Sequence, residues 1–166
     1  MTAISDRHIS GNFPLLNLPI AALRTKEDLN GRIRVFDELR HKWIKLTPEE
    51  WVRQNFISWL TTHLHYPSSL IAVETGITLN NTSRRCDTVI FYSDGTPLMI
   101  IEYKAPHITI SQETFDQIVR YNMVLHTRFL VVSNGMKHYC CEINYTTGSY
   151  RFLPSIPDYK DILSLI

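Results

Sequence analysis

Residues 87–104 read DTVIFYSDGTPLMIIEYK. Two runs rich in β-branched and large apolar residues flank a Ser-Asp-Gly-Thr turn signal, which predicts an antiparallel hairpin. If a two-residue turn centres on the Asp-Gly dipeptide, the register places Asp87 opposite Glu102. Side chains alternate along a strand, so Lys104 projects to the same face as Glu102. The hairpin therefore predicts two carboxylates and one ammonium group gathered at one strand end.

Opposed carboxylates in this position need a neutralising partner. Facing side chains on a sheet have Cβ atoms about 4.5–5.5 Å apart, where two like charges destabilise the pair. A divalent cation is the obvious partner, and hard oxygen ligands suit Mg²⁺ or Mn²⁺, which keep several waters and bridge to substrate phosphate. Such a site hydrolyses phosphodiesters with a metal-activated water, while Lys104 orients the nucleophile or balances transition-state charge. The competing interpretation is a surface strand with a charged end, because Glu-x-Lys alone is a common pattern.

The remaining patterns predict a mixed α/β domain. A Thr N-cap, a proline at the first helical position and a glutamate three residues after the cap start a helix at 48–64. Periodicity and turn signals place a lead-in hairpin within 19–46 and strands at 69–78, 87–92, 98–104 and 129–133. They also predict a second helix at 111–125. The chain is expected to end with a hairpin of 139–145 and 150–153 and a tail helix from 158. The predicted fold class is α/β, an αβββαβ core with a mixed central sheet flanked by helices, plus N-terminal and C-terminal β-hairpin additions.

Length and composition narrow the classes of protein. The chain has 166 residues, enough for one domain, which we assign to 13–166 after a flexible lead-in at 1–12. Seventeen Lys and Arg against sixteen Asp and Glu give a net charge of +1, so any phosphate partner must meet a local basic patch. The sequence shows no signal peptide and no run of about 18 apolar residues, and its three cysteines form no disulfide framework. These features predict a cytoplasmic protein with no membrane partner.

Several spaced motifs resemble the PD-(D/E)xK nuclease superfamily, in which an aspartate precedes a Glu-x-Lys couplet. The similarity is greatest to the N-terminal nuclease domain of type I restriction enzyme R subunits and their stand-alone relatives, and it covers residues 13–159. The motifs are TPEEWVRQ (47–54), RRCD (84–87), IEYKAP (101–106), QIVRYN (117–122) and SNG (133–135). The resemblance implies a Mg²⁺-dependent DNA endonuclease domain in which Asp87 and Glu102 bind the metal and Lys104 is the catalytic lysine.

The family also takes an acidic residue from its first helix, where this sequence offers Glu49 and Glu50. Glu50 can return a hydrogen bond to Thr47 in a capping box, whereas Glu49 shares the apolar helical stripe and points toward the sheet. We prefer Glu49 as the additional metal-site acid and keep Glu50 as the second choice. Glu74 is a weaker candidate, for which a partly exposed strand charge is the competing interpretation.

Further residues resemble substrate-contacting elements. Gln117 and Tyr121 lie four residues apart on one face of the second helix and resemble the Gln-x-x-x-Tyr element that positions substrate or the catalytic lysine in related nucleases. An ordinary polar helix flank is the alternative. Arg84 and Arg85 precede Asp87 and could contact the DNA backbone, because guanidinium groups match phosphate oxygens, or they could be solvated loop charges.

The sequence predicts a small deoxyribonuclease in restriction, defence or DNA processing. The alternatives are a non-catalytic nucleic-acid-binding or assembly module that keeps the fold, and an enzyme acting on another phosphate ester. The sequence contains no P-loop, so it is expected to need separate motor or specificity subunits to translocate along DNA. A homodimer is the other expected assembly, because one small site cuts one strand at a time. Zinc is disfavoured, because His63 and His65 form the single close pair.

Overall fold

The computed structural model describes residues 13–79 and 81–165, so the predicted lead-in at 1–12 lies outside the described residues. The elements are β1 (Thr25–Glu27), β2 (Ile33–Asp37), β3 (Lys42–Lys45), α1 (Pro48–Thr62), the 3-10 turn η1 (Ser68–Leu70), β4 (Ile71–Leu79), β5 (Thr82–Phe91), β6 (Pro97–Tyr103), α2 (Gln112–Leu125), β7 (Phe129–Ser133), β8 (His138–Asn144), β9 (Ser149–Leu153) and α3 (Tyr159–Ser164). The predicted αβββαβ order is confirmed by α1, β4, β5, β6, α2 and β7.

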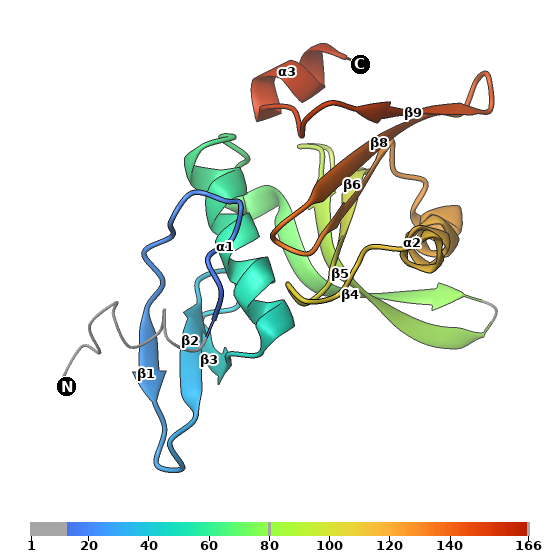
Figure 1. Cartoon of the computed structure of the whole chain (residues 1–166). Helices are drawn as coiled ribbons and strands as arrows, with labels where there is room; N and C mark the ends of the chain where they lie inside the picture. The colour runs from blue at the N-terminus through green and yellow to red at the C-terminus, as the bar shows by residue number, and fades with distance from the viewer. Residues whose placement is uncertain (1–12, 80, 166) are drawn as a thin grey trace.

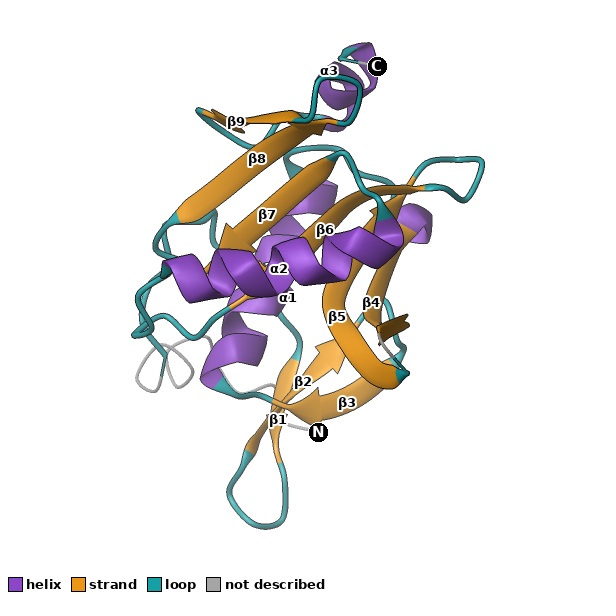
Figure 2. Ribbon diagram, turned by 90° about the vertical axis from the view of Figure 1, so that its right-hand side faces the viewer, coloured by secondary structure: helices purple, strands orange, loops and turns teal. Residues whose placement is uncertain are grey.

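The central sheet is mixed and has helices on both faces. Its six strands follow the order β4-β5-β6-β7-β8-β9, with β6 and β7 parallel and every other neighbouring pair antiparallel. Helices α1 and α2 lie on opposite sides of this sheet (Figure 1), and α2 crosses in front of it in Figure 2. Side chains of β6 alternate accordingly, because Ile101 and Tyr103 pack in the core against α1 whereas Ile100 packs in the core against α2.

Helix α1 begins where the sequence predicts. Thr47 is the N-cap, and its Oγ1 accepts a hydrogen bond from the backbone N–H of Glu50 at 3.1 Å. The fully buried side chains of Val52, Phe56 and Leu60 form the predicted apolar stripe. The helix ends at Thr62, two residues before the predicted boundary, and His65 then takes a left-handed φ of 60°.

The hairpin of β5 and β6 has the predicted register but a different turn. Gly95 donates its backbone N–H to the Tyr92 carbonyl at 3.0 Å, and the Tyr92 N–H bonds to the Thr96 carbonyl at 2.8 Å. The loop thus contains three residues, 93–95, instead of the predicted two. A β-bulge between Ile90 and Phe91 offsets the extra residue, so that the ladder resumes in the predicted register.

The N-terminal hairpin predicted within 19–46 is a separate three-stranded antiparallel sheet of order β1-β2-β3 beside α1. Sequence reasoning found the first turn, where Gly31 has a φ of 72°, but missed the second, which lacks glycine and proline. Asp37 forms that second turn by accepting the backbone N–H groups of Leu39 and Arg40 at 3.0 and 2.8 Å. Among the described residues, no helix has the length and apolar character that crossing a bilayer requires.

Candidate active site

Asp87 and Glu102 come together where β5 and β6 stop pairing. The described ladder of these two strands ends at Thr88 and Ile101, one step before the two acids. Oδ2 of Asp87 accepts the backbone N–H of Tyr103 at 2.9 Å. The carboxylate therefore satisfies a main-chain donor of β6 and is held against the strand that carries Glu102.

Helix α2 and the end of β6 both supply donors to Glu102, whose side chain is buried. Its Oε1 accepts hydrogen bonds from Nζ of Lys104 at 3.3 Å and from Nε2 of Gln117 at 2.8 Å. The same Nε2 lies 3.2 Å from the hydroxyl of Tyr121, one helical turn further along α2. The structure thus brings together Asp87, Glu102, Lys104, Gln117 and Tyr121, although their roles stay predictions.

Negative charge is concentrated at this strand end. Burial, followed by the charge of Asp87, raises the pKa of Glu102 to about 8 against the opposing effect of Lys104. Burial also raises the pKa of Asp87, although the Tyr103 N–H, Arg53 and Lys104 oppose the change. Desolvation and then the charge of Asp87 raise the pKa of Glu49. The three carboxyl groups therefore compete for protons, and each would gain from a shared cation.

Glu49 and Glu50 have different surroundings at the start of α1. Glu49 is exposed and lies within electrostatic reach of Asp87 and Lys104. Glu50 is 6% exposed, and its carboxylate forms an ion pair with Arg53 and accepts a 2.8 Å hydrogen bond from Nε2 of Gln54. The predicted capping box is therefore wrong in its second half, because the Glu50 side chain binds buried donors instead of the Thr47 backbone.

Two arginines hold a buried charge network that sequence reasoning missed. Arg40 contacts Asp37 at 2.7 Å, Glu50 at 3.6 Å and Glu74 at 2.8 Å. Arg53 contacts Glu50 and, at 3.7 Å, Glu74. The members of this network come from β2, the turn after it, α1 and β4. The periodicity of any one of these elements therefore does not predict the network. Glu74 lies on β4 with a φ of 52° and a side chain that is 39% exposed, so the predicted partly exposed strand charge is confirmed, and its carboxylate is ion-paired in this network.

Arg84 and Arg85 lie on β5, where they pair with Ile77 and Gly76 of β4. Arg85 is exposed, whereas the placement of the Arg84 side chain is outside what the structure describes. Both positions lie within four ladder pairs of the end of the β4–β5 hairpin. Their contact with DNA stays a prediction.

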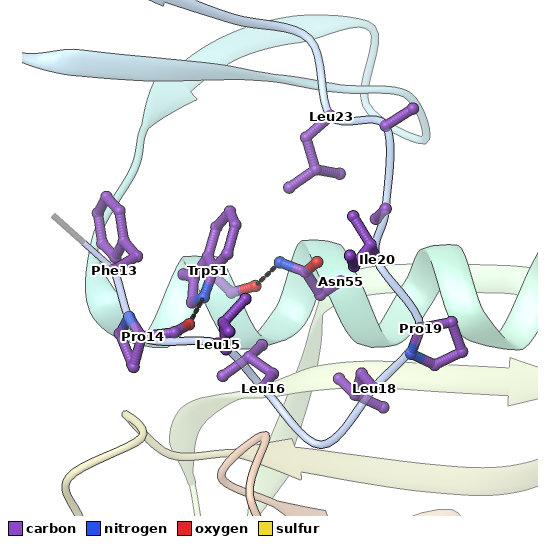
Figure 3. A pocket seen from close by; sticks show the side chains of 12 residues that line it. Phe13, Pro14, Leu15, Leu16, Leu18, Pro19, Ile20, Leu23, Trp51 and Asn55 are labelled. Atoms are coloured by element: carbon purple, nitrogen blue, oxygen red, sulfur yellow. Dashed lines mark hydrogen bonds between the residues drawn. The ribbon is translucent and has the colours of Figure 1, made fainter. Parts of the chain in front are cut away.

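The described residues contain no preformed cluster of three His, Cys, Asp or Glu side chains arranged to hold a metal ion. A pocket of about 360 Å³ lies elsewhere, between α1 and the apolar segment 13–23 (Figure 3). Trp51 lines it and donates its indole N–H to the Pro14 carbonyl at 3.0 Å. None of the candidate acids lines this pocket, and the candidate active site is the strand end where the buried Glu102 lies beside the half-buried Asp87.

Comparisons with known proteins found a matching family model and similar solved structures. The family model described as type I restriction enzyme R protein N terminus (HSDR_N) matches residues 48–157, more than half of the chain. The fold is similar to the solved fragment of a candidate HsdR subunit of a type I restriction enzyme from Vibrio vulnificus YJ016, with a TM-score of 0.53 and 19% identity over 72% of this chain. The match covers 25% of that HsdR chain.

A second solved structure belongs to a candidate nuclease of the DUF820 family from Anabaena variabilis ATCC 29413. It is 12% identical, with a TM-score of 0.45 over 85% of this chain and 88% of that chain. No match was found among curated proteins. The family match includes both β5 and β6, which carry Asp87 and Glu102, and the α1 and α2 helices beside them. The chain therefore belongs to the family of type I restriction enzyme R protein N-terminal domains.

Proposed function

We propose that the chain is a magnesium-dependent DNA endonuclease that hydrolyses phosphodiester bonds in restriction, defence or DNA processing. The observation that carries the proposal is the half-buried Asp87 beside the buried Glu102, with Lys104 3.3 Å from Glu102. Burial and the charge of Asp87 both raise the pKa of Glu102, and such a pair is costly in a purely structural role. Family membership supports the same activity, with DNA as substrate and the other subunits of a type I enzyme as partners.

The donor set fits magnesium. Mg²⁺ binds through one or two carboxylates and otherwise keeps water or substrate phosphate as ligands, so the absence of a third preformed protein ligand among the described residues is consistent with it. Asp87 and Glu102 would hold the ion, with Glu49 as the preferred additional acid. Mn²⁺ accepts the same hard oxygen donors. Bound there, the cation would polarise the scissile phosphate and lower the pKa of the attacking water.

The chain's own residues have separate roles in this proposal. Lys104 presents an ammonium group with three donors beside the acids, where it can hold the attacking water or a phosphate oxygen as negative charge develops. Gln117 fixes the orientation of Glu102 through its 2.8 Å hydrogen bond, and Tyr121 in turn contacts Gln117. Gln117 and Tyr121 therefore act as positioning residues.

Replacing Lys104 tests the proposed activity. Lys104→Ala is expected to lower the rate of Mg²⁺-dependent DNA cleavage by about 100-fold or more, since it removes a positive group from the reacting centre. Supercoiled and single-stranded DNA are incubated with wild type and variant in Mg²⁺, Mn²⁺ or EDTA. Lys160→Ala, at an exposed position on α3, is the matched control and should cleave like wild type. Equal cleavage by all three proteins would expose a contaminating nuclease, and DNA binding without cleavage in either metal would favour the non-catalytic module.

A second pair of variants distinguishes Glu49 from Glu50. Glu49→Gln should raise the Mg²⁺ concentration for half-maximal cleavage by about tenfold and leave the melting temperature unchanged, because this side chain is exposed. Glu50→Gln should lower the melting temperature, because Arg53 and Arg40 lose a buried partner. Cleavage titrated against Mg²⁺ and thermal unfolding in EDTA measure the two effects. A larger metal effect in Glu50→Gln, with its stability intact, would assign the role to Glu50 instead.

A further inference from the structure

The outward face of the β1-β2-β3 sheet carries cationic and aromatic side chains at its paired positions. The register places Lys26 opposite Arg34, Arg34 opposite Lys45, and Phe36 opposite Trp43. The other face of the same strands is apolar and packs Val35 and its neighbours toward the start of α1. Because strand side chains alternate, the cationic face points away from the core.

Three of these cations form a row across the three strands. Lys26, Arg34 and Lys45 are direct cross-strand neighbours, an arrangement in which like charges repel. Arg34 is relieved by a 3.2 Å ion pair with Asp28. Within the described ranges 13–79 and 81–165, neither lysine forms an ion pair. Repulsion among these cations lowers the stability of the isolated chain, and an anion bound across the row would relieve it.

Two aromatic rings lie beside this row. The guanidinium carbon of Arg24 is 3.9 Å from the centroid of the Phe36 ring, and Nζ of Lys26 is 4.3 Å from that of Trp43. The two rings meet edge to face at 5.4 Å, and Trp43 is 37% exposed. Cations interleaved with accessible aromatic rings are the features by which proteins bind single-stranded nucleic acid, whose bases are free to stack. In a duplex the bases are stacked inside the double helix and are not free to stack on these rings.

We infer that this face is a binding site for single-stranded DNA, separate from Asp87 and Glu102. On this face the four cations Arg24, Lys26, Arg34 and Lys45 stand against the two paired acids Glu38 and Asp28, a net charge of +2, whereas the whole chain has +1. The basic patch that a near-neutral chain needs for phosphate is thus concentrated here. Strand β3 leads within three residues to α1, the helix that carries Glu49, but the cationic face points away from the start of that helix. The inference concerns binding and does not rest on the proposed hydrolysis.

The test measures binding in EDTA, where metal-dependent cleavage cannot occur. Fluorescence anisotropy of a labelled thymidine oligonucleotide and of a labelled duplex is followed over a range of salt concentrations. The double variant Lys26→Glu/Lys45→Glu is compared with Lys42→Glu/Lys160→Glu, which makes the same charge change. Lys42 is exposed on β3 but alternates to the opposite side from Lys45, and Lys160 is exposed on α3. Circular dichroism and melting temperatures establish that both variants fold.

Wild type should bind the single strand more tightly than the duplex. Lys26→Glu/Lys45→Glu should lower the single-strand affinity about tenfold or more and reduce the slope of log affinity against log salt by roughly 1.4, the value for two lost phosphate contacts. The control should change affinity by less than about threefold. Equal losses in both variants, or tighter binding of the duplex, would overturn the inference. Loss of cleavage in Lys104→Ala with unchanged binding would separate this site from the proposed hydrolysis.

Discussion

Asp87→Asn is expected to abolish metal-dependent DNA cleavage and, at the same time, to raise the melting temperature of the metal-free protein. The proposed metal loses one of its two main carboxylate ligands, which should lower the cleavage rate by about 100-fold or more. In the absence of metal, the substitution removes a half-buried negative charge beside Glu102. The asparagine carbonyl can still accept the Tyr103 N–H, so the contact with β6 is retained.

The stability gain should depend on pH. Burial and the charge of Asp87 raise the pKa of Glu102 from 4.5 to about 8, so the folded protein binds more protons than the unfolded chain between these values. Stability conferred by this proton is present at low pH and is lost as pH rises through about 8. Asp87→Asn should lower the pKa of Glu102 and so reduce the loss of stability with rising pH. The gain in stability over wild type should be largest near pH 8. Each kcal/mol of that gain raises the melting temperature by about 2–4 °C.

Thermal unfolding of wild type and variant in EDTA at several pH values measures this effect. Asp161→Asn, at an exposed position on α3, makes the same chemical change and should leave the pH profile unaltered. A lower melting temperature for Asp87→Asn near pH 8 would show that Asp87 stabilises the metal-free fold, contrary to the proposed repulsion. Retained Mg²⁺-dependent cleavage by the same variant would contradict its role as a ligand.

Arg53→Met is expected to destabilise the protein by about 3–5 kcal/mol, the cost of leaving a buried charge without its partner. Glu50 is 6% exposed and forms its ion pair with Arg53, and Arg40 is a more distant partner at 3.6 Å. Despite the opposing effect of desolvation, the contact with Glu50 raises the pKa of Arg53. Methionine fills similar space but leaves the carboxylate to be desolvated alone or protonated.

Urea unfolding compares Arg53→Met with Arg24→Met. Arg24 forms an exposed ion pair with Glu38, so its loss should cost less than about 1 kcal/mol. The double variant Arg53→Met/Glu50→Leu should recover part of the lost stability, because it removes the stranded charge as well. If Arg53→Met were no more destabilising than Arg24→Met, the buried network would contribute little to the fold.

Local sequence patterns predicted much of the candidate site. Alternation in β6 correctly separates Glu102 and Lys104 from Tyr103, which packs against α1. The predicted register of β5 against β6 next to Asp87 is also correct, although the three-residue turn and the bulge that follows it were not predicted. The two deviations cancel because each shifts the pairing by one residue in opposite directions. The second turn of the N-terminal sheet was missed because side-chain hydrogen bonds of Asp37, instead of glycine or proline, form it.

The amino-acid sequence by itself determined the order of helices and strands and the face on which Glu102 and Lys104 lie, because both follow from periodicity within single elements. Tertiary structure alone decided how the acids of α1 differ. Both acids lie within electrostatic reach of Asp87, but Glu50 is buried and ion-paired with Arg53 of its own helix and with Arg40 from the turn after β2, whereas Glu49 is exposed. Contacts between distant segments depend on how the elements pack, so the spacing of residues within one element does not predict them.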